Sequence, residues 1–227
     1  MLTVHHLQVS QSERLVWLCE ELNIPYDLKI HKRDPIFSPQ SIKDLHALGT
    51  APIIQDGDLT LSETAACAEW IMYKHGNGRL ALPPNHANYA DYLFFFHFSQ
   101  GSLQPMIGRL MVLQLAGVGA DNPTAKTMHH KMAQQLKYLD DHLEKPHNTW
   151  LAGQDFSAAD IMTVFTLTTM RSLYSLDLSE YKNVLAWLGR CTKREAYVRA
   201  HEKGDPGLEL MIDGPAPPNF LAKASKM

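Results

Sequence analysis

The chain has 227 residues, of which 45% are hydrophobic and 20% are charged, as in an ordinary globular protein of one large or two small domains. Its formal net charge is −3 and it has no basic stripe, so we expect no nucleic acid partner. The N-terminus lacks the pattern of a secretory signal. The most apolar region, residues 93–120, is interrupted by polar and charged side chains, whereas a membrane span needs about 20 predominantly apolar residues. We therefore predict no transmembrane segment.

The cysteines and histidines do not form a recognisable metal or disulfide pattern. Cys19, Cys67 and Cys191 contain no CxxC pair, and an odd, sparse count is typical of a reducing compartment. Each lies among apolar residues, where a small buried hydrophobic side chain is expected. The histidine pairs His5-His6 and His129-His130 place adjacent side chains on opposite sides of their backbone. We predict no metal site.

The first 80 residues alternate between strand and helix patterns. Residues 3–7 form a short apolar strand, and Ser10 or Ser12 begins a helix that runs to about Leu22. A period-two pattern over residues 26–30 predicts the next strand. A strand, helix and strand with short connections imply a right-handed unit in which the two strands are parallel.

A hairpin and a further helix complete this part of the chain. Residues 32–48 are polar and contain at most a short helix. Two strand patterns, 52–55 and 58–61, flank Asp56-Gly57, a pair typical of a tight hairpin turn because glycine readily adopts positive φ. A helix is predicted from residue 63 to about 75. The whole is a compact α/β layer with helices against a four-stranded sheet.

The second part of the chain is predicted to be helical throughout. Pro83-Pro84-Asn85 is the best candidate for a linker. It separates a domain of residues 1–82 from an all-helical domain of residues 86–227, in which the tail from Gly204 onward is irregular. Ser157 and Asp160 stand at the N-cap and N3 positions of a capping box. Helical periodicity covers residues 86–116, 124–144, 157–172 and 181–195.

Three short segments of the first domain place polar groups at the ends of predicted elements. Ser10 and Ser12 lie where the first strand leads into the first helix, beside unpaired backbone N–H groups, although each taken alone is more simply explained as an N-cap. Pro52 begins a strand, where a trans edge residue is the default and a cis bond the less common alternative. Glu63 and Thr64 begin a helix, where capping is again the simple explanation.

Taken together and in this order, these segments resemble the glutathione transferases. The resemblance covers the chain up to about residue 200 and implies a thioredoxin-like α/β N-terminal domain followed by an all-α helical bundle. It is strongest for the fungal and bacterial branch represented by a yeast membrane-associated glutathione transferase. The segments that carry the resemblance are residues 10–22 (SQSERLVWLCEEL), 32–34 (KRD), 45–49 (LHALG), 101–105 (GSLQP) and 156–161 (FSAADI).

The resemblance implies a role for each of these site residues. Ser10, with Ser12 as the alternative, would activate the glutathione thiol. Ala51, before a cis Pro52, would pair its backbone with the cysteinyl part of glutathione. Glu63 would bind the γ-glutamyl ammonium group, and Thr64 would bind the carboxylate of the same end.

Two departures from the family pattern affect this assignment. Thr50 stands where many relatives have a lysine that contacts the glycyl end of glutathione, and His46 is a speculative substitute for that lysine. Position 10 is not a cysteine, which argues against the thiol-transferring branches of the family. A redox transferase would need a cysteine at the start of the first helix, and Cys19 lies two turns too far along it.

The implied function is conjugation of the glutathione thiolate, with glutathione as co-substrate, to hydrophobic electrophiles during detoxification. Reduction of hydroperoxides is an implied side activity. The alternative is a binding or regulatory module that keeps the fold without turnover. The second substrate is expected where the helical domain faces Ser10, although most of the nearby apolar residues are better explained as core: Phe94, Phe95, Phe96, Phe98, Met106 and Met111.

The expected assembly and location follow partly from the resemblance and partly from general rules. A homodimer is implied by the family, and twofold dimers are also the commonest oligomers. We expect a cytoplasmic protein, with peripheral attachment to internal membranes as the alternative.

Overall fold

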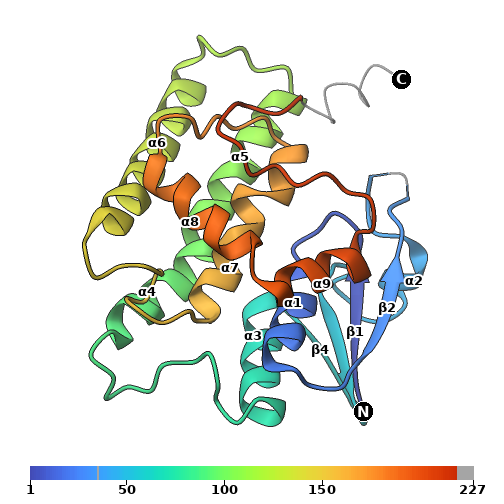
Figure 1. Ribbon diagram of the computed structural model, residues 1–227. Helices are drawn as coiled ribbons and strands as arrows, with labels where there is room; N and C mark the ends of the chain where they lie inside the picture. Colours follow the sequence, from blue (N-terminus) through green and yellow to red (C-terminus); the bar gives the residue numbers. More distant parts are fainter. Residues whose placement is uncertain (35, 219–227) are drawn as a thin grey trace. The chain divides into compact units, whose positions relative to one another are not determined.

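The computed structural model describes residues 1–34 and 36–218, which form two compact units (Figure 1). The first unit contains residues 1–89 together with residues 191–209. The second contains residues 90–190 and, within the described part, residues 210–218. The α/β first unit and the helical second unit confirm the predicted fold class. A segment from the far end of the chain, which the sequence assigned to the helical half, thus packs with the first unit.

The first unit is built on a four-stranded mixed sheet in the order β2-β1-β3-β4. Its strands are β1 (Leu2–Leu7), β2 (Asp27–His31), β3 (Ile53–Asp56) and β4 (Leu59–Ser62). β1 and β2 are parallel, as the short helical connection predicts, and the other two pairs are antiparallel. Gly57 lies in the β3–β4 turn with a φ of 61°, which is the conformation that the hairpin prediction required.

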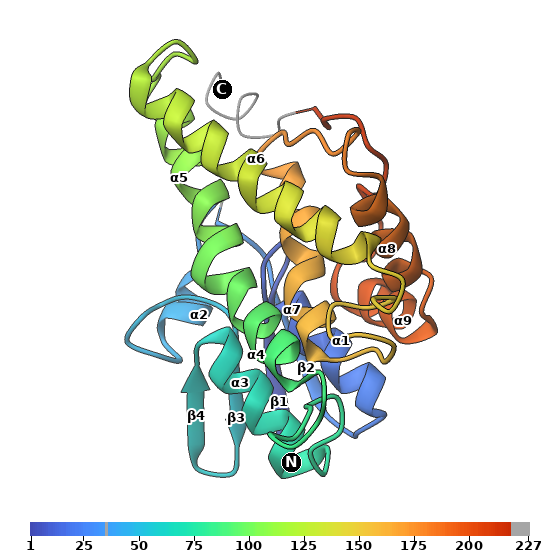
Figure 2. The same cartoon turned by 90° about the vertical axis from the view of Figure 1, so that its left-hand side faces the viewer.

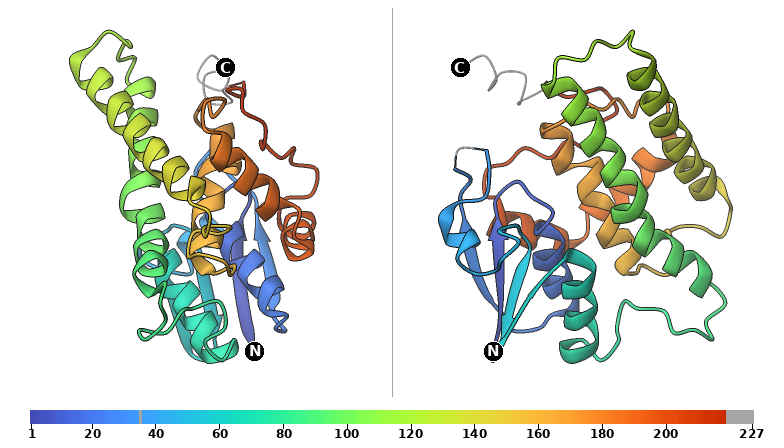
Figure 3. Two further views of the ribbon diagram at one scale, coloured as in Figure 1. Left: turned by 60° about the vertical axis from the view of Figure 1, so that its left-hand side comes forward. Right: turned by 180° about the vertical axis from the view of Figure 1, so that it is seen from behind.

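Helices lie on both faces of this sheet. α1 (Glu13–Leu22) and α3 (Thr64–Trp70) lie on one face, and the short α2 (Gln40–Lys43) lies on the other (Figures 1 and 3). The predicted helix over 63–75 has two parts, because α3 continues into a π-helical turn, η1 (Ile71–His75).

A helix that lies outside the four predicted periodic stretches, α9 (Glu195–Gly204), packs along α1 (Figure 3). Two adjacent acids on α1 hold it there. Glu21 accepts two hydrogen bonds from Arg194, at 2.6 and 2.8 Å, and Glu20 accepts one from Arg199 at 3.0 Å. Both carboxylates are largely buried, so these ion pairs attach the returning segment to the first unit.

The second unit is a helix bundle in which α5 and α6 run side by side (Figure 2). Its elements are α4 (Tyr89–Phe98), η2 (Ser99–Leu103), α5 (Gln104–Leu115), α6 (Pro123–Glu144), α7 (Ala158–Leu167), η3 (Thr169–Ser172) and α8 (Lys182–Thr192). The continuous helix predicted over 86–116 is interrupted by the π-helical turn η2. Pro105 explains the break, because its nitrogen has no hydrogen to donate to the preceding turn. In the described part of the chain, none of the helices combines the length and hydropathy that a membrane span requires.

The predicted capping box at the start of α7 is confirmed, and its acid has further partners. Asp160 accepts hydrogen bonds from the N–H of Ser157, the N–H of Leu151 and the indole N–H of Trp187, at 2.8 to 3.0 Å. Its side chain is fully buried. Burial raises the pKa of Asp160 to about 6, although these hydrogen bonds act to lower it. The carboxylate therefore joins α7, the loop before it and α8.

Residues 210–218 are irregular, as predicted, but one side chain fixes them; the rest of the tail predicted to be irregular, residues 219–227, lies outside the described residues. Arg171 is completely buried and its guanidinium donates only to backbone carbonyl groups. These belong to Leu176, Met211, Asp213, Gly214 and Pro215. Burial lowers the pKa of Arg171.

Candidate functional site

The two serines predicted as alternatives for one role are in direct contact. The hydroxyl oxygens of Ser10 and Ser12 are 2.7 Å apart in the connection between β1 and α1. Ser12 occupies the N-cap position of α1, but its hydroxyl makes no capping hydrogen bond to the helix. That oxygen instead accepts the N–H of Leu7 at 3.0 Å. Simple capping therefore does not explain Ser12.

The expectation of unpaired backbone donors beside these serines is only partly met. The N–H groups of Glu13, Arg14 and Leu15 donate to the carbonyls of the three residues before the helix, at 3.0 to 3.3 Å. The chain makes a tight turn before the helix begins, and this turn uses the donors that a bare helix end would leave open. A ligand at this point would depend mainly on the Ser10 hydroxyl and on the helix dipole.

Behind the serines lie two residues that sequence reasoning did not select. Ser12 Oγ is 2.8 Å from Nδ1 of His6, and Nε2 of His6 is 3.1 Å from a carboxylate oxygen of Asp205. His6 and Ser12 are completely buried, and Asp205 is 4% exposed. A histidine on a buried strand just before the serines was the available signal for His6. Nothing in the sequence indicated Asp205, which reaches the site only because α9 returns to the first unit.

The loop that carries Ser10 is held in an unusual backbone conformation. Val9 has a φ of 54°, which is rare for a β-branched residue. The N–H of Val9 donates to Asp205 at 2.8 Å, and its carbonyl accepts from Arg33 at 2.6 Å. Backbone strain of this kind is found preferentially at functional sites and persists only where surrounding contacts impose it. Here Asp205 and Arg33 impose it.

The Ala51-Pro52 peptide bond is cis, as the family resemblance implies and contrary to the default for a strand-entering proline. Both residues are buried. The carbonyl of Ala51 accepts a hydrogen bond of 3.0 Å from the side chain of Gln11, which connects this segment to the serine loop. A carbonyl oxygen has two lone pairs, so Ala51 can accept a further donor.

Glu63 and Thr64 stand at the junction of β4 and α3. Glu63 is exposed and has a φ of 76°, again a conformation rare for a residue with a side chain. Thr64 is completely buried, and its hydroxyl has no hydrogen-bond partner. Buried polar atoms are nearly always paired, so this hydroxyl is suited to a ligand.

The register of the strands places the three predicted segments at the same end of the sheet. His5 of β1 lies opposite Ile53 of β3, which in turn lies opposite Ser62 of β4. The serine loop follows β1, the cis proline precedes β3, and Glu63 follows β4, so all three leave the sheet at the same end. Ser62 Oγ also donates to the carbonyl of Pro52 at 3.2 Å.

The residues expected at the glycyl end of glutathione are less well defined. Thr50 is exposed and lies directly before the cis-proline segment. His46 is half-buried, and its Nδ1 accepts the N–H of Leu48 at 3.3 Å. Neither position supplies the cation that many relatives have.

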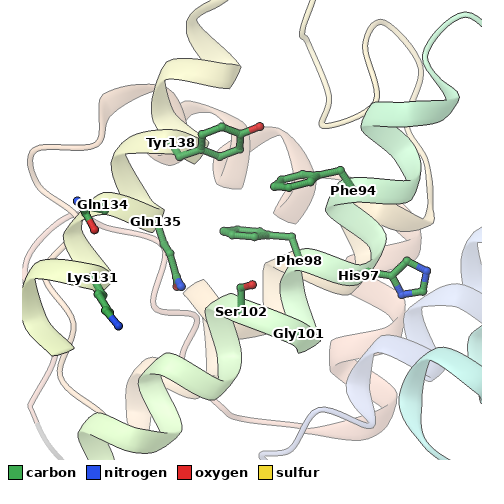
Figure 4. Close-up of a pocket in the computed structure, with 9 residues that line it drawn as sticks. All are labelled: Phe94, His97, Phe98, Gly101, Ser102, Lys131, Gln134, Gln135 and Tyr138. Carbon is green, nitrogen blue, oxygen red and sulfur yellow. The ribbon is translucent and has the colours of Figure 1, made fainter.

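The aromatic residues considered for a second substrate divide into core and surface. Phe95, Phe96, Phe98 and Met106 are buried, whereas Phe94 is 44% exposed. Phe94 stacks on Phe98 beside a cleft of about 750 Å³ that lies wholly within the second unit (Figure 4). Its lining comes from α4, η2 and α6: Phe94, His97, Phe98, Gly101, Ser102, Lys131, Gln134, Gln135 and Tyr138. None of the predicted glutathione residues lines this cleft.

The cysteines are free and buried, as expected from their apolar surroundings. Burial raises the pKa of Cys19 far above its usual range and raises that of Cys67 to about 12. Cys19 is therefore a protonated thiol at neutral pH, which argues against a redox role at the first helix.

Comparison with known proteins assigns nearly the whole chain to one family. Family models described as the N-terminal and C-terminal domains of glutathione S-transferase match residues 10–72 and 86–195. Glutathione S-transferase 3 of Schizosaccharomyces pombe is 31% identical, over 94% of this chain and 92% of that protein. Glutathione S-transferase 1 of Saccharomyces cerevisiae is 25% identical, over 89% and 95%. The crystal structure of a glutathione S-transferase from Actinobacillus pleuropneumoniae matches with a TM-score of 0.81 at 28% identity, over 92% of this chain and 95% of that one. The chain belongs to the glutathione S-transferase family.

Proposed function

We propose that this protein conjugates the glutathione thiolate to hydrophobic electrophiles, with reduction of hydroperoxides as a side activity. The observation that carries the proposal is the meeting of three polar segments at one end of the sheet: the Ser10 hydroxyl, the Ala51 backbone and the Glu63-Thr64 pair. Each offers the groups that one part of glutathione requires. The non-catalytic alternative is less favoured, because a module without turnover would have no need of a hydroxyl at position 10.

In this proposal Ser10 is the residue that contacts the thiol. A thiol with a pKa of about 8.5 is roughly 3% ionised at pH 7, and lowering that pKa by two units requires about 2.7 kcal/mol. A hydrogen bond to a charged group supplies about 1.5–3 kcal/mol. The helix dipole adds about 0.3–1 kcal/mol. Ser12 is the poorer candidate, because it is completely buried and already bonded to Leu7 and His6.

The rest of glutathione is assigned to the other two segments. Ala51 would pair its backbone with the cysteinyl part, and Pro52 would shape that strand entry. Glu63 would take the γ-glutamyl ammonium group, while the unpartnered Thr64 hydroxyl would donate to the neighbouring carboxylate. Thr50 would meet the glycyl end through its hydroxyl. Glutathione is the only co-substrate that the proposal needs, and it requires no metal.

Replacing Ser10 tests the proposal directly. In Ser10→Ala the pKa of the bound thiol should rise to about 8, just below 8.5 because the helix dipole remains, so the thiolate fraction at pH 7 should fall roughly 5- to 15-fold and conjugation of a chloronitrobenzene should fall with it. Ultraviolet absorbance of the thiolate and the conjugation rate measure the two effects. Ser179→Ala, at an exposed serine of the second unit, is the control and should behave as the wild type.

Three outcomes would redirect the proposal. If Ser10→Ala keeps both thiolate and turnover while Ser12→Ala loses them, the activating residue is Ser12. If the wild-type protein binds glutathione but conjugates nothing, the binding-module alternative is supported. If it does not bind glutathione, the proposed function is wrong.

The finer placement within the family is also a proposal. The relatives from two yeasts and from Actinobacillus pleuropneumoniae support the fungal and bacterial branch. Three free cysteines are typical of a reducing compartment and support a cytoplasmic location; peripheral attachment to internal membranes is the alternative, and cell fractionation separates the two.

A homodimer is the assembly we expect in solution. Light scattering on a sizing column should give twice the mass of one chain, because closed twofold dimers predominate among soluble oligomers. A single-chain mass at micromolar concentration would contradict this expectation.

A further inference from the structure

Four side chains form a continuous hydrogen-bonded chain that runs from the surface of the first unit into its interior. Ser10 contacts Ser12 at 2.7 Å, Ser12 contacts His6 at 2.8 Å, and His6 contacts Asp205 at 3.1 Å. Ser10 is 7% exposed and forms the outer end, whereas Ser12 and His6 are fully buried. His6 lies on β1, the two serines lie in the loop before α1, and Asp205 directly follows α9.

The directions of these hydrogen bonds follow from the chemistry of the inner end. A carboxylate can only accept, so Nε2 of His6 carries the hydrogen and donates to Asp205, which leaves Nδ1 as an acceptor. The Ser12 hydroxyl has two acceptors within reach, Nδ1 of His6 at 2.8 Å and the carbonyl of Leu7 at 3.2 Å, and we assign its hydrogen to the shorter contact, with Nδ1. Its oxygen accepts the N–H of Leu7. Because the single hydroxyl hydrogen of Ser12 is used in the bond to His6, Ser10 must be the donor in the contact between the two serines. At rest, the hydroxyl hydrogen of Ser10 points inward, away from any thiol outside.

We propose that this chain is a proton relay and that His6 receives the proton of the bound glutathione thiol. The proposal rests on the function proposed above. The thiol S–H bond breaks and its proton passes to Ser10 Oγ; the Ser10 proton passes to Ser12 Oγ, and the Ser12 proton passes to Nδ1 of His6. The products are a thiolate and an imidazolium, with no proton gained or lost overall. The transfer reverses the three hydrogen bonds between the thiol and Nδ1 of His6, so that Ser10 now donates to the thiolate, while Nε2 of His6 continues to donate to Asp205.

Asp205 has two functions in this arrangement. One oxygen holds the ring of His6 and stabilises its positive charge after proton transfer, and the other accepts the N–H of Val9 and so fixes the Ser10 loop. The end of α9 can pack this closely against the ring of His6 because residue 204 is a glycine. A Cβ at that position would lie 3.0 Å from Nε2 of His6. His6 and Asp205 both act through the serines and are positioning residues for the thiol.

Asp205 is the group that balances the positive charge of His6 after proton transfer. The other charged and titratable groups around the relay are histidines or already have other partners. His31 of β2 and His201 of α9 interact with His6, and burial lowers the pKa of both. Arg33 interacts with Asp205 and already donates to three backbone carbonyls. His5, the neighbour on β1, bonds instead to His31 and Gln55.

The same residues could suggest a serine hydrolase, but their burial argues against it. In a hydrolase the serine bonded to the histidine must reach a carbonyl carbon of the substrate. Ser12 has no exposed surface, and both its neighbours along the chain of hydrogen bonds are protein groups. Ser10 reaches the outside but is separated from His6 by Ser12. The arrangement therefore suits proton transfer to a buried base and not nucleophilic attack.

The decisive experiment counts protons when wild-type protein binds glutathione. Calorimetry in two buffers of different ionisation enthalpy gives the protons released, and ultraviolet absorbance gives the thiolate formed, both at about pH 7. S-methylglutathione, which has no thiol, corrects for other ionisations. The relay predicts thiolate with almost no proton released to the buffer. Release of about one proton per thiolate would overturn it, since the proton would then have left the protein.

A variant pair tests the same step through the thiol pKa. In His6→Asn the amide oxygen can still accept from Ser12 but cannot bind a proton, so the thiol pKa should rise by about one unit, giving about tenfold less thiolate at low pH. Affinity for S-methylglutathione should change less than twofold, about 0.4 kcal/mol. His5→Asn is the control, because His5 is also buried on the same strand, at 6% exposure, and lies outside the relay.

The outcomes separate the relay from the function on which it rests. If Ser10→Ala raises the thiol pKa and His6→Asn does not, the relay is wrong and the glutathione transferase proposal stands. If the wild type forms neither thiolate nor conjugate, the proposed function itself fails. If His6→Asn does not fold, the proton count on the wild-type protein still decides.

Discussion

Changing Glu63 to glutamine is expected to weaken glutathione binding by roughly tenfold or more. The carboxylate is proposed to bind the γ-glutamyl ammonium group, and a hydrogen bond between charged partners contributes about 1.5–3 kcal/mol, of which 1.4 kcal/mol is a factor of ten. Because this contact is equally strong before and during the reaction, KM for glutathione should rise while kcat at saturation stays nearly constant. Steady-state kinetics and calorimetric titration measure the two effects.

Two further variants separate the charge of Glu63 from its unusual backbone. Glu63→Gly relaxes the conformation at a φ of 76° but still lacks the carboxylate, so its affinity should fall as far as that of Glu63→Gln. Asp58→Asn removes an exposed acid from the turn at the opposite end of β4 and should leave affinity unchanged. Equal losses in Glu63→Gln and Asp58→Asn would mean that general electrostatic attraction, and not a specific contact, binds the ligand.

The largest expected effect on stability comes from Asp160→Asn. The carboxylate accepts hydrogen bonds from three buried donors, the N–H groups of Leu151 and Ser157 and the indole of Trp187. An asparagine has one acceptor oxygen, and its NH₂ group would face a donor. Each buried donor left unpaired costs about 1–3 kcal/mol, so we expect a loss of roughly 3 kcal/mol. That loss corresponds to a drop in Tm of roughly 6–12 °C, measurable by calorimetry or tryptophan fluorescence.

A milder variant and a pH series control this prediction. Ser157→Ala removes only the hydroxyl of the capping box and should cost about 1 kcal/mol. The raised pKa of Asp160 means that the folded state holds this proton more tightly than the unfolded state. The resulting stabilisation is complete below about pH 4 and is lost as the pH rises through about 6. Asp160→Asn should abolish that part of the pH dependence. A wild-type-like Tm in Asp160→Asn would show that the three donors find other acceptors.

Local patterns predicted the parts of the fold that depend on neighbouring residues. The parallel β1–β2 pair, the hairpin around Gly57 and the capping box at Ser157 each follow from a few consecutive side chains. The interruption of the long helix near Pro105 follows from a missing backbone donor, but apolar periodicity continues through it and concealed the break. Apolar periodicity did not indicate helix α9, because most residues of its buried face are small: Ala196, Tyr197, Ala200 and Gly204. Its ion pairs with α1 join residues distant in sequence and leave no local pattern.

The residues of the candidate site also divide into those that a local sequence pattern indicates and those that depend on contacts distant in sequence. Ser10, Ala51 and Glu63 could be selected because each lies at the end of an element that the sequence predicts. Their meeting at one end of the sheet required the register of β1, β3 and β4. Asp205 could not be selected, because its only relevant property is that it lies beside His6, 199 residues away in sequence.

The return of residues 191–209 to the first unit has a consequence for biosynthesis. Until residue 205 has been made, the first unit lacks α9 and the inner end of the Ser10–Asp205 chain. At about 5–20 residues per second, the serine loop is synthesised on the order of ten to forty seconds before Asp205. The helices of the second unit emerge during that interval. The first unit is therefore completed only after the second has been made, so a chain that stops before Asp205 has no complete relay.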